Sequence, residues 1–172
     1  MSLEHAILGF LNYRPASGYD LKKIFDVSVQ HFWPADQSQI YRTLSRLEEE
    51  GWVEMEIVHQ EDRPDRKVHH ITPAGQKELR RWLTTPLPPT PIREPKLIQV
   101  FFAGQLTDEQ ILEMFERMAH RLRKLLEHYE HVPADIGEYY NVVNAPRETF
   151  FWMLTLDCGI HTAPAQLALV ES

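Results

Sequence analysis

Residues 36–50 read DQSQIYRTLSRLEEE and predict a short helix with two unlike faces. Ile40, Leu44 and Leu47 recur three or four residues apart, which is the spacing of one apolar helix face. Asp36 is a preferred residue type at the position just before a helix begins. The other face carries side chains that form hydrogen bonds: Ser38, Gln39, Tyr41, Arg42, Thr43 and Arg46. Such a helix packs on its own domain through one face and offers the other to a partner.

Two further helices are predicted before this one. An apolar helical face runs from Leu3 to Leu11, and Pro15 closes that segment. Ser17 followed by Asp20 resembles a capping box at the start of the second helix. The sequence therefore predicts three short helices in its first 50 residues.

A hairpin is predicted beyond the third helix, because the hydrophobic period changes to two. Val53, Met55 and Ile57 alternate with glutamates, which is typical of a half-buried strand. A polar loop with Pro64 follows, and residues 66–71 can return as a second strand.

A fourth helix and a linker are predicted after the hairpin. Thr72 and Pro73 are a cap followed by a proline at the first helical position, and the expected buried face is Leu79, Trp82 and Leu83. Five prolines fall within residues 84–95, which predicts a semi-extended linker and a domain boundary.

The second half of the chain predicts two long helices. We expect the first at 107–131, ended by Pro133, and the second to begin at Pro146. The segment FFWMLTL in the second is apolar on every side.

Three helices followed by a two-stranded hairpin indicate a winged helix-turn-helix. We expect a mainly α fold with a small β-hairpin: an N-terminal winged helix-turn-helix DNA-binding domain (1–85), a proline-rich linker (86–95) and a C-terminal helical dimerisation and effector domain (96–172). The B-DNA major groove admits one α-helix, so 36–50 is the candidate recognition helix. Its positive N-terminal end is expected to face the DNA.

Net charge alone does not favour a nucleic-acid partner, because the chain carries −7. Residues 1–85 hold 11 Lys and Arg against 13 Asp and Glu, a balance of −2, so most of the net negative charge, −5, lies in residues 86–172. The hairpin loop, residues 60–67, is called the wing, and its part RPDRK, residues 63–67, holds three basic residues against one Asp. We expect the wing on the DNA backbone or in the minor groove. The expected DNA-contacting side chains outside the recognition helix are Lys22, Arg63, Arg66 and Lys67.

The segments AILGFL, SGYDLKKIF, FWPADQSQIYRTLSRLEEEGWV and RKVHHITPAGQKEL resemble the PadR family of bacterial transcriptional regulators. The C-terminal part, with LTLDCGI, resembles the helical domain of the longer PadR-like proteins. The resemblance implies a dimeric winged-helix regulator, usually a repressor, released by a small molecule. It places the family's recognition-helix tyrosine at Tyr41 and the basic wing residues at Arg63, Arg66 and Lys67. The sequence departs from the family at Arg42, where many members have proline, and at Asp157, where a basic residue is common.

A homodimer is expected because the C-terminal half has few elements to cover its apolar surface. The expected dimerisation residues are Phe115, Met118, Leu122, Leu125, Tyr129, Phe151 and Leu154. The two recognition helices would then lie about 34–36 Å apart on double-stranded DNA with a pseudo-palindromic operator. A small aromatic effector could bind among Trp33, Phe101, Phe102, Phe150, Phe151 and Trp152, although dimer packing is the better explanation for most of these aromatic residues.

Other classes of protein find little support in the sequence. Enzyme motifs are missing, so no catalytic residue and no cofactor is expected. The single cysteine excludes an internal disulfide, and His128 and His131 have no evident third ligand for a metal. No apolar stretch is long enough for a membrane span, and a cytoplasmic protein, at the nucleoid when DNA-bound, is expected. The acidity keeps one alternative open, a protein-interaction or small-molecule-binding module without specific DNA binding.

Overall fold

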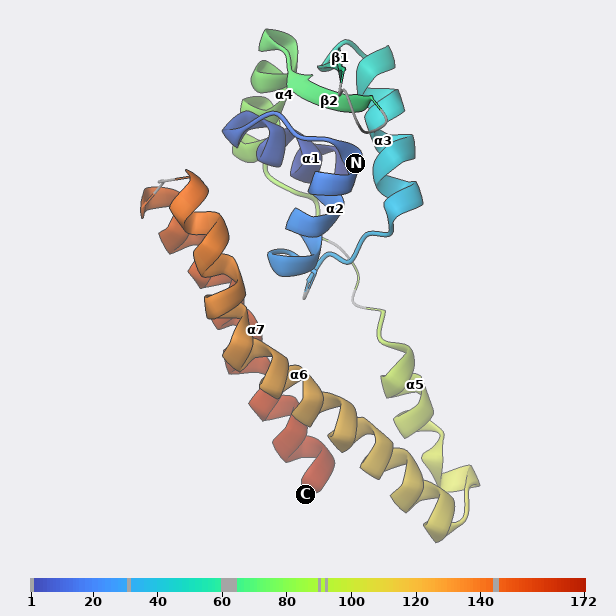
Figure 1. The fold of residues 1–172 in the computed structure, drawn as a ribbon. Coiled ribbons are helices and arrows are strands. Elements are labelled where there is room, and N and C mark those ends of the chain that lie inside the picture. The colour runs from blue at the N-terminus through green and yellow to red at the C-terminus, as the bar shows by residue number, and fades with distance from the viewer. Residues whose placement is uncertain (1, 31, 60–64, 90, 92, 144–145) are drawn as a thin grey trace. The chain divides into compact units, whose positions relative to one another are not determined.

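The computed structural model describes residues 2–30, 32–59, 65–89, 91, 93–143 and 146–172, and their side chains outside 131–143 and 146. The chain forms two compact units, Met1–Pro86 and Leu87–Ser172. The first contains α1 (Ser2–Tyr13), α2 (Gly18–Val27), α3 (Gln37–Glu49), β1 (Val53–Val58), β2 (Arg66–Ile71) and α4 (Pro73–Thr84). The second contains α5 (Pro95–Phe101), the 3-10 turn η1 (Ala103–Gln105), α6 (Asp108–Val143) and α7 (Pro146–Glu171) (Figure 1). The expected mainly helical fold with one small hairpin is confirmed.

Capping boxes begin α2 and α3 where the sequence predicts helix starts. The Ser17 hydroxyl accepts a hydrogen bond from the Asp20 N–H at 3.2 Å, and the Ser17 N–H donates to the Asp20 carboxylate at 3.0 Å. Asp36 and Gln39 exchange the same two bonds at 2.8 and 2.9 Å. An N-cap of this kind is worth about 1 kcal/mol, so both helices begin at fixed residues.

The core of the first unit lies between α1, α2 and α3. Its fully buried side chains come from all three helices and are Ile7, Leu8, Leu21, Phe25, Ile40, Leu44 and Leu47. Burial of each such side chain stabilises the fold by about 1.5–3 kcal/mol. The core therefore fixes the apolar face of α3 inward, as predicted, and turns its other face outward.

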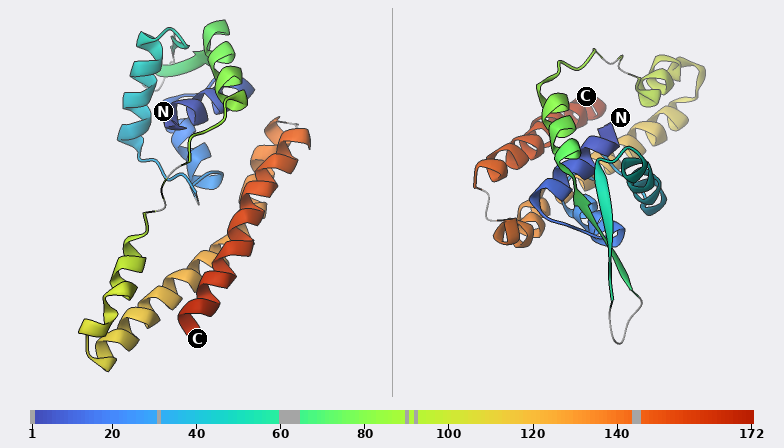
Figure 2. Two further views of the ribbon diagram at one scale, coloured as in Figure 1. Left: turned by 180° about the vertical axis from the view of Figure 1, so that it is seen from behind. Right: turned by 90° about the horizontal axis from the view of Figure 1, so that it is seen from above.

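The hairpin is antiparallel and joined to the loop before α2. Val53 of β1 pairs with Ile71 of β2. Ala16 exchanges two backbone hydrogen bonds with His69 of β2, at 3.2 and 2.9 Å, and so adds a one-residue third strand. Figure 2 shows the two strands projecting away from the helices of their unit.

Two expectations of buried side chains in this unit are wrong. In β1 only Val53 is buried, whereas Met55 and Ile57 are 37% and 50% exposed. Leu83, placed on the buried face of the fourth helix, is 65% exposed near the end of α4. An alternating pattern of apolar residues identifies a strand, and a helical spacing identifies a helix. Neither pattern tells whether another element of the fold covers those apolar side chains.

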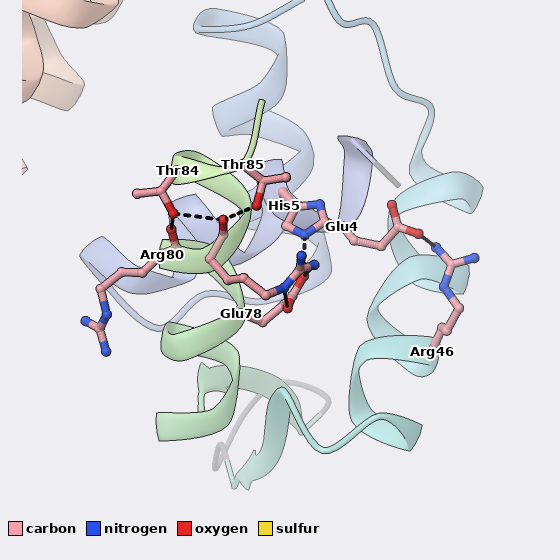
Figure 3. Close-up of polar contacts among 8 residues, drawn as sticks. Glu4, His5, Arg46, Glu78, Arg80, Thr84 and Thr85 are labelled. Carbon is pink, nitrogen blue, oxygen red and sulfur yellow. Dashed lines mark hydrogen bonds and ion pairs between the residues drawn. The ribbon is translucent and has the colours of Figure 1, made fainter. Parts of the chain in front are cut away.

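Neighbouring side chains of α1 hold the helices on either side of it. Glu4 forms an ion pair with Arg46 of α3. His5 points to α4, with its Nε2 3.0 Å from Glu78 Oε1 and its ring stacked on Trp82 at 4.5 Å between centroids. Figure 3 draws the polar contacts, with α1 between the other two helices.

The Glu78 carboxylate makes the stability of this unit acid-sensitive. Hydrogen bonds from the Arg81 guanidinium at 2.6 and 2.7 Å, followed by His5, lower the pKa of Glu78 from 4.5 to about 2. A carboxyl whose pKa is lowered by folding stabilises the fold above its unfolded pKa, and that contribution is lost as the pH falls through the folded value. We expect Glu78→Gln to lower the urea midpoint at pH 7, and the gap to wild type to shrink between about pH 4.5 and pH 2. Exposed Glu54→Gln is the control, and a Glu78→Gln gap equal at pH 7 and pH 3 contradicts the assignment.

The second unit is built on the packing of α6 against α7. Tyr129, Leu156 and Ala163 are buried together between the two helices, and Leu125, Leu126 and Met153 pack around them. No residue of α5 is buried.

The predicted end of the first long helix is wrong. We expected 107–131 with a stop at Pro133, but α6 continues through this proline to Val143. The capping pair of Thr107 and Gln110 does begin it, through bonds at 3.1 and 3.4 Å. An interior proline costs a helix about 3 kcal/mol, and packing along a neighbouring helix can offset a cost of that size.

Candidate nucleic-acid interface

The outward face of α3 is polar and exposed along its first turns. Ser38, Gln39, Tyr41 and Arg42 are all exposed there. The Ser38 hydroxyl donates to the Asp36 carboxylate at 2.7 Å, and that bond, followed by the Gln39 N–H, lowers the pKa of Asp36. Gln39 uses only its side-chain oxygen in the cap, so its amide N–H groups remain available as donors.

Arg42 is the cation of this face that is best placed for a partner. It is exposed, and no ion pair joins it to another residue in the part of the chain that the structure describes. Its guanidinium offers five N–H donors in a planar fork, which matches the acceptor pair on the major-groove edge of guanine.

Thr43 was expected on the outward face, and this expectation is wrong. Its side chain is 6% exposed. Thr43 follows Ile40 by three residues and precedes Leu47 by four, so the helical period places it on the buried side.

Tyr41 packs against Gly18 at the start of α2. A Cβ added to Gly18 would lie 2.6 Å from Tyr41 Cε1, so the ring occupies the space that only a glycine leaves open. Tyr41 is still 43% exposed, which leaves part of the ring for a partner. The glycine therefore sets the position of Tyr41 on the outward face.

Arg46 is exposed but engaged inside its own unit. Its guanidinium donates to the carboxylate of Glu4, which is nearly buried (Figure 3). Burial raises the pKa of Glu4, but hydrogen bonding of the carboxylate and nearby positive charge, including that of Arg46, outweigh burial and lower it. The sequence places Arg46 on the correct face and does not reveal this pairing.

Of the other basic residues expected at the DNA, in the wing and on α2, those that the structure describes are either paired with a carboxylate of the same unit or have no such pair there. Arg66 donates to the Asp20 carboxylate, and Lys22 pairs with Asp26 one turn along α2. Lys67 is exposed, with no ion pair to any residue within the described ranges. Arg63 lies outside the described residues.

The C-terminal end of α3 is acidic and contacts strand β2. Glu48 Oε1 lies 3.0 Å from Nε2 of the buried His69. Glu49 and Glu50 are exposed beside it. Negative charge at this end repels phosphate, so the N-terminal half of α3 is the end suited to a polyanion.

The expected dimerisation residues separate into three groups. Leu125 and Tyr129 pack against α7 of the same chain, and Tyr129 is 6% exposed, so the expectation that it contacts a second copy is wrong. Phe115, Met118 and Leu122 are half-buried on α6. Phe151 and Leu154 are 49% and 53% exposed on the side of α7 away from α6. They begin an exposed row, called the outer row of α7, whose members are Phe151, Leu154, Cys158, Ala165 and Leu169.

The described residues contain no cluster of side chains that could hold a metal ion. Among the same residues no helix is long and apolar enough to cross a membrane.

Two family models together match almost all of the chain. Residues 7–81 match the transcriptional regulator PadR-like family, and residues 92–172 match the family described as virulence activator alpha C-term. The chain carries a PadR-like domain followed by a C-terminal domain of the second family. Members of the PadR-like family are regulators and not enzymes.

Curated relatives of this PadR-like chain match it over part of their length. The probable transcriptional regulator Rv1176c of Mycobacterium tuberculosis is 48% identical over 90 residues, which are 52% of this chain and 48% of the relative. The negative transcriptional regulator PadR of Bacillus subtilis is 31% identical over 116 residues, which are 66% of this chain and 63% of the relative. The chain thus spans from about half to under two thirds of these relatives.

Solved structures of PadR-like regulators share the fold. Bacillus subtilis PadR in complex with operator DNA has a TM-score of 0.82 at 24% identity, over 99% of this chain and 96% of that one. The same protein in complex with p-coumaric acid has a TM-score of 0.74 at 25% identity, over 99% and 95%. This likeness establishes the winged-helix regulator fold.

Proposed function

We propose that this PadR-like regulator is a dimeric, sequence-specific DNA-binding repressor that a small molecule releases. Residues 1–85 act as the DNA-binding domain, 86–95 as the linker and 96–172 as the dimerisation and effector domain. α3 enters the major groove with its N-terminal half, and the wing contacts the backbone or the adjacent minor groove. The observation that carries the proposal is the exposed, hydrogen-bonding face of α3, with Arg42 left without a described ion partner.

The proposed dimer is supported by the outer row of α7. Phe151, Leu154 and Cys158 are spaced by three and four residues, which is the seam along which two helices pack. Two recognition helices held by a two-fold axis would contact half-sites about 34–36 Å apart on a pseudo-palindromic operator. The DNA complex of Bacillus subtilis PadR supports DNA as the partner.

The proposed effector is a small aromatic molecule. The p-coumaric acid complex of Bacillus subtilis PadR supports this chemical class. Within residues 87–172 exposed aromatic side chains are available for stacking, among them Phe101, Phe102 and Phe150. The repressor function and the identity of the effector are parts of the proposal.

A footprint on the DNA just upstream of the protein's own gene is the first test. A protected segment with two half-sites one helical turn apart is expected. Its affinity for the protein is expected to fall by about 0.9 log unit per log unit of salt for each phosphate neutralised. Equal affinity for this segment and for random DNA in a competition gel-shift assay contradicts the proposal.

Replacing Arg42 by alanine tests the recognition helix directly. We expect Arg42→Ala to cost about 1–3 kcal/mol of operator binding and to relax base preference at one position of each half-site, because a bidentate base contact is lost. The measurement is gel-shift titration against the operator and its single-base variants. Arg80→Ala is the control, since it removes the same charge from an exposed site on α4. Unchanged base preference in Arg42→Ala contradicts the assignment.

A further inference from the structure

Arg66 is the basic residue of the wing whose contacts differ most from those of a phosphate ligand. It is the first residue of β2, and its guanidinium is directed to the carboxylate of Asp20 in the first turn of α2. The two side chains are 48% and 28% exposed. The pair joins two elements that lie 46 residues apart in the sequence.

Asp20 is held in place by Ser17, independently of its contact with Arg66. The carboxylate accepts from the Ser17 N–H at 3.0 Å and from the Ser17 hydroxyl. Burial raises the pKa of Asp20, but the hydrogen bonds of Ser17 and Arg66 outweigh burial and lower it. The carboxylate is therefore a fixed anionic acceptor in the helix cap, and the arginine is the longer, more mobile partner.

We propose that Arg66 is a positioning residue of the DNA interface and not a phosphate ligand: its pairing with Asp20 fastens the foot of the wing to the first turn of α2. This inference rests on the proposed DNA-binding function. Lys67, the next residue, has no ion pair within the described ranges. Side chains alternate along a strand, so fixing Arg66 toward α2 directs Lys67 to the opposite face of the hairpin.

The direction in which Asp20→Asn changes operator affinity distinguishes the two possible roles of Arg66. If Arg66 positions the wing, Asp20→Asn weakens operator binding by about two- to fivefold, the size expected for a half-exposed ion pair. If Arg66 binds phosphate, Asp20→Asn frees it and removes a negative charge near the DNA, so binding tightens. Oδ2 of Asp20 accepts both the Ser17 N–H and the Arg66 guanidinium, so asparagine with its oxygen in that place removes only the charge that holds Arg66. The Ser17 hydroxyl still accepts the N–H of residue 20, so the cap of α2 is retained.

The experiment measures operator affinity against salt for wild type, Asp20→Asn, Arg66→Gln and the double variant. We expect both single variants to weaken binding, the double variant to be no weaker than either, and the salt slope of Arg66→Gln to equal that of wild type. Lys67→Gln is the comparison, and its slope is expected to fall by about 0.9. Tighter or unchanged binding by Asp20→Asn, or a slope for Arg66→Gln lower by about 0.9, overturns the proposal.

Hydrogen exchange of the DNA-free protein keeps this test separate from the test of function. Faster exchange of the β2 amides in both single variants supports the fastening of the wing, and exchange equal to wild type overturns it. Failure of the wild-type protein to prefer its operator counts against the proposed function and leaves the exchange result to decide on Arg66.

Discussion

Replacing Gly75 by alanine is expected to destabilise the first unit by about 1–3 kcal/mol or more. Gly75 lies in the first turn of α4, where a Cβ would run into the carbonyl oxygen of Trp52 and lie 2.9 Å from the Ile71 side chain. The obstructing atom belongs to the backbone, so it cannot move aside as the end of a flexible side chain does. The free energy of unfolding follows from the midpoint and slope of urea unfolding, read by tryptophan fluorescence. Three of the four tryptophans, Trp33, Trp52 and Trp82, lie in the first unit.

Gly9→Ala is the matched control for this prediction. Gly9 lies inside α1, and nothing stands within 4 Å of the Cβ that alanine would add. Alanine is favoured over glycine in a helix interior by about 0.5–1 kcal/mol, so the control is expected to be neutral or stabilising. Similar midpoints for the two variants contradict the close packing of α4 on the Trp52 backbone.

Leu154→Asp is expected to convert the proposed dimer to a monomer. Leu154 is 53% exposed in the outer row of α7, where a partner helix would desolvate the new carboxylate. Loss of the second recognition helix removes the avidity of two linked half-sites, so operator affinity is expected to fall by about 10²–10⁴. Size-exclusion chromatography with light scattering reads the mass, and a gel-shift titration reads the affinity.

Leu83→Asp is the control for the dimer prediction. It makes the same change at a leucine that is 65% exposed at the end of α4, in the first unit and outside the outer row. We expect it to remain dimeric and to bind the operator like wild type. Dimers of equal mass for both variants contradict the use of this row as an interface.

The local structure of the first unit could be predicted from the sequence because short-range signals carry it. Ser17 with Asp20 and Asp36 with Gln39 are three residues apart, and their hydrogen bonds do not depend on the rest of the fold. The buried stripe of α3 likewise follows from its period alone. Burial on the hairpin could not be predicted, since the exposure of Met55 depends on whether another element covers that part of β1.

Long-range pairing explains what sequence reasoning missed in the candidate site. The partner of Arg46 is 42 residues away, and that of Arg66 is 46 residues away. Glu4 is the one carboxylate of α1, a largely apolar helix, which is the one local sign that it needs a basic partner. Asp20 could be identified as a cap, but its second role appears only when β2 folds back beside α2. Gly18 gives no local sign, because the ring that requires it comes from α3.

The short strand at Ala16 has a mechanical consequence for release from DNA. Ala16 connects α1 to α2 and is hydrogen-bonded to β2, whose His69 in turn contacts Glu48 of α3. The hairpin is thereby coupled to both helices of the helix-turn-helix and cannot swing alone. In the proposed dimer, an effector bound within residues 87–172 must then change the separation or tilt of two DNA-binding domains that each move as a rigid body.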